Sequence, residues 1–262
     1  MNARRQVVLI GHGISYSASP AMHTAAFASA GLDWTYGLCD VPPERLPAAV
    51  AALRGPDYAG ANVTIPHKVA VIPLLDELDG PAEATGAVNT IRRDGNRLIG
   101  SNTDVAGIQA ALDEVGLDPA GARAVVLGAG GSARAAAAAL PGARLAFVAR
   151  RPAAAAGLPG QVLSWDDPAW WRLARDADLL LNATPQGRGQ ELPLPVSELP
   201  ARGAVVDLVY TAAGTPLVRA ARERGLPCAD GWTVLLAQGA AAFEAWTGSP
   251  APLEAMRAAL PR

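Results

Sequence analysis

The sequence is poor in the residues that disulfide frameworks and metal sites require. It has two cysteines, Cys39 and Cys228, which lie far apart and outside any C-x-x-C spacing, so neither a disulfide framework nor a zinc site is expected. Its three histidines, His12, His23 and His67, lack the spacing of metal ligands and are predicted to be structural. We therefore expect no metal and a reducing, cytoplasmic location.

Long apolar runs and an excess of positive charge are also missing. Half of the residues are hydrophobic, but charge, glycine or proline interrupts each apolar stretch before the roughly 20 residues that a transmembrane helix needs. The apolar run after Arg4 and Arg5 is too short for a signal-peptide core and is predicted to be a first strand. The formal net charge is −2 with both signs interspersed, which argues against a nucleic-acid-binding face. A small molecule is the expected ligand, with no nucleic-acid or membrane partner.

The order of apolar and helical segments predicts an α/β protein with two domains. At 262 residues the chain exceeds the usual size of a single core. Over residues 6–66, strand-like runs alternate with alanine-rich helical stretches, and glycine or proline marks each change. This alternation predicts a mostly parallel, right-handedly wound sheet. Asp94-Gly95 is then a turn signal for a hairpin within residues 87–104.

A second series of strands and helices, with a sheet of its own, extends over residues 122–228. Residues 233–262 have helical spacing and no following strand, and such a tail often packs back on the first domain of a two-domain enzyme. We therefore predict an N-terminal substrate-binding and catalytic domain at residues 1–103, completed by helices within 232–262. A Rossmann dinucleotide-binding domain is predicted at residues 104–231.

The strongest local motif is rich in glycine and stands between an apolar strand and an alanine-rich helix. It fits G-x-G-x-x-A and consists of Gly128, Ala129, Gly130, Gly131, Ser132 and Ala133. The first glycine permits a tight turn, the second lets the backbone approach a pyrophosphate, and the small alanine lets the helix pack closely on the strand. The helix N-terminus offers free N–H groups to the phosphates. A purely structural turn is the alternative.

The end of the next strand favours NADP over NAD. An NAD-binding unit places Asp or Glu about 20 residues after the first glycine, where it binds the ribose hydroxyls. Here that stretch reads Val148-Ala149-Arg150-Arg151, without a carboxylate. Two guanidinium groups suit a bidentate grip on a phosphate. A solvated arginine turn is the alternative interpretation.

Three polar clusters in the first domain exceed what its strands and helices need. They are Ser15–Pro20, Asn62–Lys68, and Asn89–Thr90 together with Asn102–Asp104. Each falls where a strand gives way to a loop or helix, which is the edge where open α/β sheets bind ligands. Hydroxyls, amides, one cation and one carboxylate at this edge indicate a site for a small polyhydroxylated acid.

Each of these residues also has a structural interpretation. Ser19 fits a helix N-cap before Pro20, Asn62 and Thr64 fit a turn, and Lys68 fits a solvated helix position. A lysine near a carboxylate, with a nicotinamide from the other domain, is what carbonyl reduction requires, because a proton must reach the oxygen while hydride reaches the carbon. The nucleotide motif directly downstream therefore favours a catalytic site.

Eight motifs in order resemble the shikimate dehydrogenase family over roughly residues 7–247. They are S-x-S-P-x-x-H, N-V-T-I-P-x-K, G-A-V-N-T, G-x-N-T-D, G-A-G-G-S-A-R-A, N-A-T-P, D-L-V-Y with T-P-L, and V-L-L-A-Q. The resemblance implies NADP-dependent, reversible reduction of 3-dehydroshikimate to shikimate in aromatic amino-acid biosynthesis.

The resemblance also implies roles for single residues. Lys68 and Asp104 match the catalytic pair, and we expect Asp104 to orient Lys68 and favour its ammonium form. The residues that hold the substrate carboxylate match Ser17, Ser19 and contacts around Tyr210. Those that contact the substrate hydroxyls match Thr64, Asn89 and Gln238. The matching cofactor residues are the six of the glycine-rich motif with Arg150, Arg151, Thr184, Leu208 and Gly231.

Two stretches depart from the family pattern. Where the family commonly has Asn-Arg-Thr, this chain has Ala149-Arg150-Arg151, so one amide and one hydroxyl contact to the 2′-phosphate are missing. The usual G-L-G-M appears as Gly231-Trp232-Thr233-Val234. Trp232 is either a residue that narrows the cleft or an ordinary core aromatic.

Other functions are consistent with parts of the pattern. A quinate/shikimate dehydrogenase paralogue would accept a further ring hydroxyl or use NAD. A non-catalytic binding protein on the same fold would not need Lys68 and Asp104, which are both present. An enzyme similar to methylene-tetrahydrofolate dehydrogenase would bind folate, whereas the paired serines favour a small carboxylate. The chain is expected to be either a monomer or a homodimer.

Overall fold

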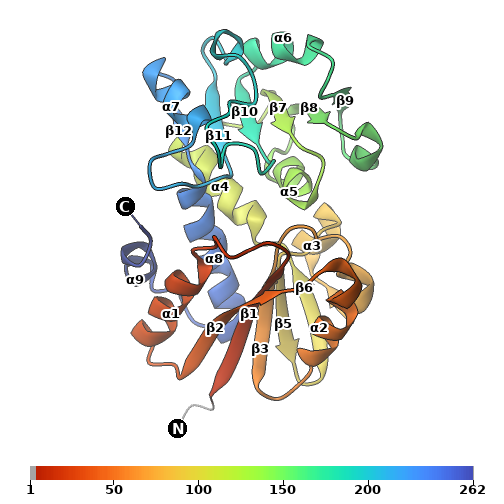
Figure 1. Ribbon diagram of the computed structural model, residues 1–262, viewed down its shortest axis with the longest axis vertical. Coiled ribbons are helices and arrows are strands. Elements are labelled where there is room, and N and C mark those ends of the chain that lie inside the picture. Colours follow the sequence, from red (N-terminus) through yellow and green to blue (C-terminus); the bar gives the residue numbers. More distant parts are fainter. Residues whose placement is uncertain (1–3, 262) are drawn as a thin grey trace. The chain divides into compact units, whose positions relative to one another are not determined.

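The computed structural model describes residues 4–261 and divides into two compact units. The first unit runs to Thr103 and resumes at Leu235, and the second spans Asp104–Val234. The predicted domains started at residue 1 and ended at residue 262; residues 1–3 and 262 lie outside the described residues. In Figure 1 the red to yellow strands belong to the first unit, and the blue helix α9 (Leu253–Ala258) packs against its red helix α1 (Ser19–Ser29).

The first unit contains a six-stranded sheet in the order β2-β1-β3-β5-β6-β4. All neighbouring pairs are parallel except those of β5, which is antiparallel to β3 and β6. The sheet is therefore mostly parallel, as the sequence predicts. Its strands are β1 (Arg5–Gly11), β2 (Trp34–Asp40), β3 (Tyr58–Val63), β4 (Glu77–Leu78), β5 (Thr90–Asp94) and β6 (Arg97–Ser101).

The hairpin between β5 and β6 is present, but its loop lies one residue later than predicted. Asp94 pairs with Arg97, so Gly95 and Asn96 form the loop instead of Asp94 and Gly95. Gly95 has a φ of 60°, which glycine adopts without the steric penalty of a Cβ atom. Strand β4 and the short helix α3 (Gly80–Thr85) were not predicted, because they are too brief to show a hydrophobic period.

Helices cover both faces of this sheet. Helix α2 (Leu46–Ala52) packs on the face that carries Ala61 and Val63, whereas α1 and α8 (Gly231–Thr247) contact the opposite face. The Trp246 indole of α8 occupies the space above Gly60, where a Cβ atom would lie 2.7 Å from its Nε1. That Nε1 donates a hydrogen bond to the Ile91 carbonyl at 3.0 Å. The C-terminal helices thus complete the first unit.

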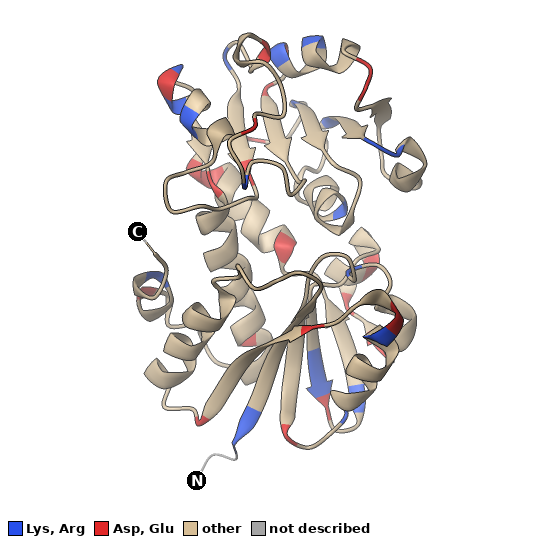
Figure 2. Ribbon diagram, in the orientation of Figure 1, with Lys and Arg blue, Asp and Glu red and all other residues tan. Residues whose placement is uncertain are grey.

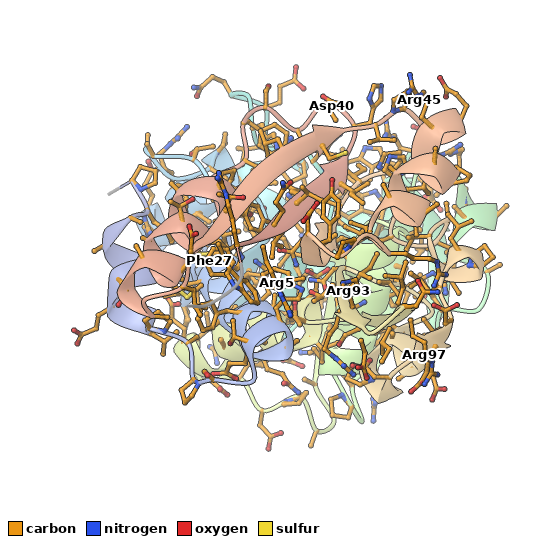
Figure 3. The ribbon with its side chains drawn as sticks, turned by 90° about the horizontal axis from the view of Figure 1, so that it is seen from below. Arg5, Phe27, Asp40, Arg45, Arg93 and Arg97 are labelled. Carbon is orange, nitrogen blue, oxygen red and sulfur yellow. The ribbon has the colours of Figure 1, made fainter. Side chains whose placement is uncertain are left out.

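Aromatic contacts attach α1 to the same layer. Phe27 of α1 stacks on Phe243 of α8, with ring centroids 5.8 Å apart. Figure 3 looks at this unit from below and shows Phe27 among the side chains between the red α1 and the blue C-terminal helices. Both phenylalanines are fully buried, so the contact belongs to the core.

The second unit contains a fully parallel sheet in the order β12-β11-β10-β7-β8-β9. Counted from its first strand, this is the order 3-2-1-4-5-6 of the Rossmann fold, read from the other edge. Its strands are β7 (Arg123–Leu127), β8 (Arg144–Ala149), β9 (Gln161–Ser164), β10 (Leu179–Asn182), β11 (Ala204–Asp207) and β12 (Cys228–Ala229). Its helices are α4 (Asp104–Glu114), α5 (Gly131–Ala139), α6 (Ala169–Arg175) and α7 (Pro216–Glu223), with the first turn of α8.

Charged residues and the two cysteines are distributed over both units. Acidic and basic residues are interspersed on each unit (Figure 2). Cys39 in β2 and Cys228 in β12 are free. Over residues 4–261, no helix is both long and apolar enough to cross a membrane.

Candidate active site

Thr64 follows β3 at its carboxyl end, where the backbone turns sharply. Its N–H donates to the Ile10 carbonyl of β1, and its own carbonyl accepts the N–H of His67, both at 2.8 Å. The peptide bond between Ile65 and Pro66 in this turn is cis. Thr64 is half-buried, and its backbone is fixed to the neighbouring strand.

Lys68 continues from this turn and is also half-buried. It lies in a turn, so the interpretation of Lys68 as a helix residue is wrong. Its carbonyl accepts the N–H of Val88 at 2.7 Å, and the preceding His67 is buried with its Nε2 2.7 Å from the Val41 carbonyl. One backbone hydrogen bond and one side-chain hydrogen bond therefore hold the segment that carries the lysine.

Asn89 is the centre of a buried polar network at the start of β5. Its Oδ1 accepts the Thr103 N–H at 2.7 Å and the Thr90 hydroxyl at 3.0 Å. Its Nδ2 donates to Thr103 Oγ1 at 3.0 Å and to Gln238 Oε1 at 3.4 Å. The structure therefore brings Asn89 and Gln238 together, and both were predicted to contact substrate hydroxyls.

Asn62 extends this network across β3. It lies within the strand, so the alternative interpretation of Asn62 as a turn residue is wrong. Its Nδ2 donates to the Asn89 carbonyl at 3.1 Å and to Thr90 Oγ1 at 3.0 Å, and its Oδ1 accepts the Tyr36 hydroxyl at 2.7 Å. On the other side of Tyr36, the ring of His23 stacks with a centroid distance of 4.6 Å.

His23 is fully buried, and neither of its ring nitrogens has a hydrogen-bond partner within the described part of the chain. Burial lowers its pKa to about 3, because the protonated ring would be an unsolvated charge. His23 is therefore a neutral aromatic residue of the core that also contacts Trp246.

The segment after β6 leads to the predicted catalytic carboxylate. Asn102 is buried and donates from Nδ2 to Thr85 Oγ1 at 3.0 Å and to the Ala87 carbonyl at 2.9 Å. Asp104 is buried and is the first residue of α4. Lys68 belongs to the first unit and Asp104 to the second.

The two predicted serines lie at the start of α1. The N-cap is Ala18, not Ser19, and the N-cap side chain makes no capping hydrogen bond. Instead, Ser17 Oγ accepts the N–H of Ser19 at 3.3 Å. Because Ser19 is the first helical residue and is not the N-cap, the capping interpretation of Ser19 is wrong.

The glycine-rich turn of the second unit connects β7 to α5. Gly128 has a φ of 120°, and its N–H donates to the Val148 carbonyl at 2.8 Å. Gly130 is the N-cap of α5, makes no side-chain cap, and has open space where a Cβ atom would lie. Ala133 is fully buried against the sheet. This uncapped helix end, with backbone accessible at Gly130, fits the pyrophosphate of a dinucleotide.

Arg150 and Arg151 directly follow β8, as predicted from the sequence. Both side chains are exposed, and within residues 4–261 neither forms an ion pair. Two unneutralised guanidinium groups at this strand end fit a ribose phosphate.

Thr184, Leu208 and Gly231 lie at the carboxyl ends of β10, β11 and β12. Thr184 donates from both its N–H and its hydroxyl to Asn182 Oδ1, at 3.1 and 2.7 Å. The N–H of Leu208 donates to the Asn182 carbonyl at 3.0 Å. Gly231 must lack a side chain, because a Cβ atom would lie 2.5 Å from the Leu208 carbonyl oxygen.

Tyr210 and Trp232 are in ring contact, with centroids 4.5 Å apart. Trp232 Nε1 also donates to the Thr211 carbonyl at 3.2 Å. Trp232 therefore supports the loop that carries Tyr210, a role that its position in the sequence did not reveal.

A Rossmann unit with an open glycine turn, together with a second α/β unit whose strand ends carry a lysine and a hydrogen-bonded amide network, defines a two-unit nucleotide-dependent dehydrogenase. Family models sharpen this assignment. The "Shikimate dehydrogenase substrate binding domain" matches residues 9–91, and the "Shikimate 5'-dehydrogenase C-terminal domain" matches residues 231–260.

Curated relatives match nearly the whole chain. The shikimate dehydrogenase (NADP(+)) of Moorella thermoacetica is 45% identical and covers 95% of this chain and 90% of the relative. The shikimate dehydrogenase (NADP(+)) of Methanopyrus kandleri is 43% identical, covering 99% and 96%. The chain belongs to the shikimate dehydrogenase family.

Solved structures of this family share the fold. The shikimate 5-dehydrogenase of Thermus thermophilus, in complex with NADP(H) and shikimate, is 37% identical with a TM-score of 0.86, covering 97% of this chain and 98% of that one. The enzyme of Listeria monocytogenes, in complex with shikimate and NAD, is 32% identical with a TM-score of 0.84, covering 97% and 96%.

Proposed function

We propose that this protein is an NADP-dependent shikimate dehydrogenase that reversibly reduces 3-dehydroshikimate to shikimate in aromatic amino-acid biosynthesis. The observation that carries the proposal is the identity of 45% over 95% of the chain to an NADP-dependent relative. The residues needed for carbonyl reduction, Lys68 and Asp104, are both present. This combination argues against a non-catalytic binding protein.

Binding of the cofactor is assigned to the second unit. The glycine-rich turn would hold the pyrophosphate, Arg150 and Arg151 the 2′-phosphate, and the loops with Thr184, Leu208 and Gly231 the nicotinamide half. When bound, NADPH supplies the hydride for the substrate carbonyl carbon. The exposed guanidiniums after β8 support the preference for the phosphorylated cofactor.

Proton transfer is assigned to Lys68. On reduction, its ammonium group gives a proton to the oxygen of the former carbonyl, and on oxidation the neutral amine takes the hydroxyl proton. Asp104 is assigned as the carboxylate that orients this amine. Two hydrogen bonds of the lysine segment, at the Lys68 carbonyl and at His67 Nε2, support this role, because a proton donor must be held in place to act.

Substrate recognition is assigned to hydroxyl and amide groups. Ser17 and Ser19 hold the carboxylate with contacts around Tyr210, and Thr64, Asn89 and Gln238 bind the ring hydroxyls. The buried hydrogen bonds of Asn89 support the assignment, because they fix the positions of its Oδ1 and Nδ2 atoms.

We also infer a cytoplasmic homodimer. The two free cysteines suit a reducing compartment. β2 is an edge strand with Leu38 42% exposed, and an edge of this kind can pair with a second copy. Light scattering after gel filtration would test the dimer, and a mass of one chain would contradict it.

Steady-state rates with shikimate and quinate, each with NADP⁺ and NAD⁺, test the function. We expect efficient turnover of shikimate with NADP⁺ and much slower turnover in the other three combinations. Quinate turnover comparable to that of shikimate would instead identify the quinate/shikimate paralogue, and equal rates with NAD⁺ would reject the cofactor assignment.

A further inference from the structure

Asp207 is a fully buried carboxylate at the last position of β11, beside Asn182 at the last position of β10. Its Oδ1 accepts Asn182 Nδ2 at 2.9 Å and the Val209 N–H at 3.0 Å. Its Oδ2 accepts the Thr215 hydroxyl at 2.6 Å. Three donors from three segments therefore converge on one carboxylate.

Asn182 transmits this arrangement to a second loop. Its Nδ2 donates to Asp207 and to the Gln186 carbonyl at 2.9 Å, which leaves its Oδ1 to accept both hydrogen bonds from Thr184. Gly187 of the same loop lies against the carboxylate, since a Cβ atom there would be 3.4 Å from Asp207 Oδ2. Loop 183–188 is thus fixed through the amide that Asp207 orients.

An uncharged residue would not satisfy the same donors. Thr215 Oγ1 already accepts the Val218 N–H at the start of α7, so its hydroxyl hydrogen is directed to Asp207. An asparagine at position 207 would offer one acceptor oxygen and one NH2 group in place of two acceptor oxygens, so one of the three donors would lose its partner. A buried carboxylate is costly in an α/β core, and the carboxylate is the group that accepts all three hydrogen bonds.

We propose that Asp207 is a positioning residue that holds loops 183–188 and 208–215 in the conformation that binds the dinucleotide, without touching cofactor or substrate itself. These loops carry Thr184, Leu208 and Tyr210. The proposal rests on the cofactor assignment of the proposed function.

The protonation of Asp207 should make the loop conformation depend on pH. Burial raises the pKa of Asp207 to about 6, despite the hydrogen bonds from Thr215, Val209 and Asn182. These three neighbours, at the N-cap of α7, in the loop after β11 and on β10, are uncharged. Asp230 after β12 adds a repulsive negative charge, and its carboxylate lies 3.7 Å from the Arg222 guanidinium. Protonation below this pH replaces an acceptor with a donor, so the loops lose a hydrogen bond.

The test compares two aspartates at opposite ends of the same sheet. Asp178 directly precedes β10 and accepts the Arg123 N–H at 2.9 Å, so D178A also removes a carboxylate that holds backbone. The full-length chain and its variants would be titrated with NADP⁺ by calorimetry, without substrate, and their thermal unfolding measured. We expect both variants to lower Tm, but only D207A to weaken NADP⁺ binding, by about tenfold or more.

D207N keeps the proposal testable if D207A fails to fold. We expect D207N to bind NADP⁺ more weakly than the natural chain at pH 8, with the two converging near pH 5. The ratio of the two dissociation constants is the relevant quantity, because the cofactor 2′-phosphate also titrates at a pH of about 6.

Wild-type affinity for NADP⁺ in D207A, or a D207N ratio that does not change with pH, would overturn the positioning role. Failure of the proposed function looks different, because the unaltered chain would then bind no NADP⁺ or would not oxidise shikimate.

Discussion

The side-chain oxygen of Asn89 accepts the backbone N–H of Thr103 at 2.7 Å. The backbone of Asn89 also bonds to Ser101 and Val63, so one buried residue connects the ends of β3, β5 and β6. Thr103 directly precedes Asp104 in the chain. Asn89 therefore fixes the backbone that leads to the proposed catalytic carboxylate, besides its proposed contact with substrate.

We expect Asn89→Ala to raise the KM for shikimate and to destabilise the protein by about 1–3 kcal/mol, because it removes the acceptor of the Thr103 N–H. Asn102→Ala is the matched control, since Asn102 is as buried and also bonds within the first unit, but has no assigned ligand contact. Urea unfolding should show both losses of stability. A KM raised equally in both variants would contradict a substrate contact by Asn89.

Lys68 is the single lysine of the sequence, and every other basic residue is arginine or histidine. Arginine does not deprotonate in proteins, so Lys68→Arg keeps the charge but cannot transfer a proton. We expect this variant to lose about 10²- to 10⁴-fold in kcat while its NADP⁺ dissociation constant stays unchanged. Wild-type kcat in Lys68→Arg would reject the assignment of Lys68 as proton carrier.

Replacing both Arg150 and Arg151 by alanine should weaken NADP⁺ binding by about tenfold or more and leave NAD⁺ binding nearly unchanged, because the lost contacts serve the 2′-phosphate. Arg144→Ala, at the other end of β8, is the control for the loss of positive charge from the unit. Calorimetric titrations with both cofactors supply the measurement. An equal loss of affinity for NADP⁺ and NAD⁺ would show that these arginines do not bind the 2′-phosphate.

The buried His23 should make the protein less stable in mild acid. The pKa of His23 is about 3 in the folded state against 6.5 for a free histidine, so between these values the unfolded chain binds a proton that the folded chain does not. Its contribution is fully present above pH 6.5 and falls as the pH drops, by about 2 kcal/mol at pH 5.

The variant His23→Phe keeps an aromatic ring against Tyr36 and removes the titrating group. Urea unfolding at pH 7.5 and at pH 5 should therefore show a smaller loss of stability in the variant than in the natural chain. If both proteins lose the same free energy of unfolding between these pH values, His23 is not the source of the effect.

Regular features of the fold were accessible from the sequence because they depend on local patterns. The glycine-rich turn follows from the need for a positive φ at Gly128, and Arg150 and Arg151 follow the strand whose apolar run ends at Ala149. The series of strands and helices predicted over residues 122–228 includes β9, whose four residues carry too little periodic signal to be located individually.

The polar networks depend on pairing between distant strands and were therefore harder to predict. Asn62 was recognised as part of a polar cluster, but its partners Tyr36 and Thr90 lie on other strands. Asn182 and Asp207 lie within the N-A-T-P and D-L-V-Y motifs, yet their mutual contact requires the register of β10 against β11. The motifs identified these segments in the sequence, whereas the contact between the two side chains depends on the strand register.

The first unit is built from two separate segments of the chain, since it ends at Thr103 and begins again at Leu235. A ribosome therefore releases the whole second unit before the part of α8 that, together with α1, covers one face of the first sheet. The Rossmann unit is continuous and can fold as it emerges. The site of Trp246 above Gly60 therefore stays uncovered until α8 is synthesised, so the unit begun first during synthesis is completed last.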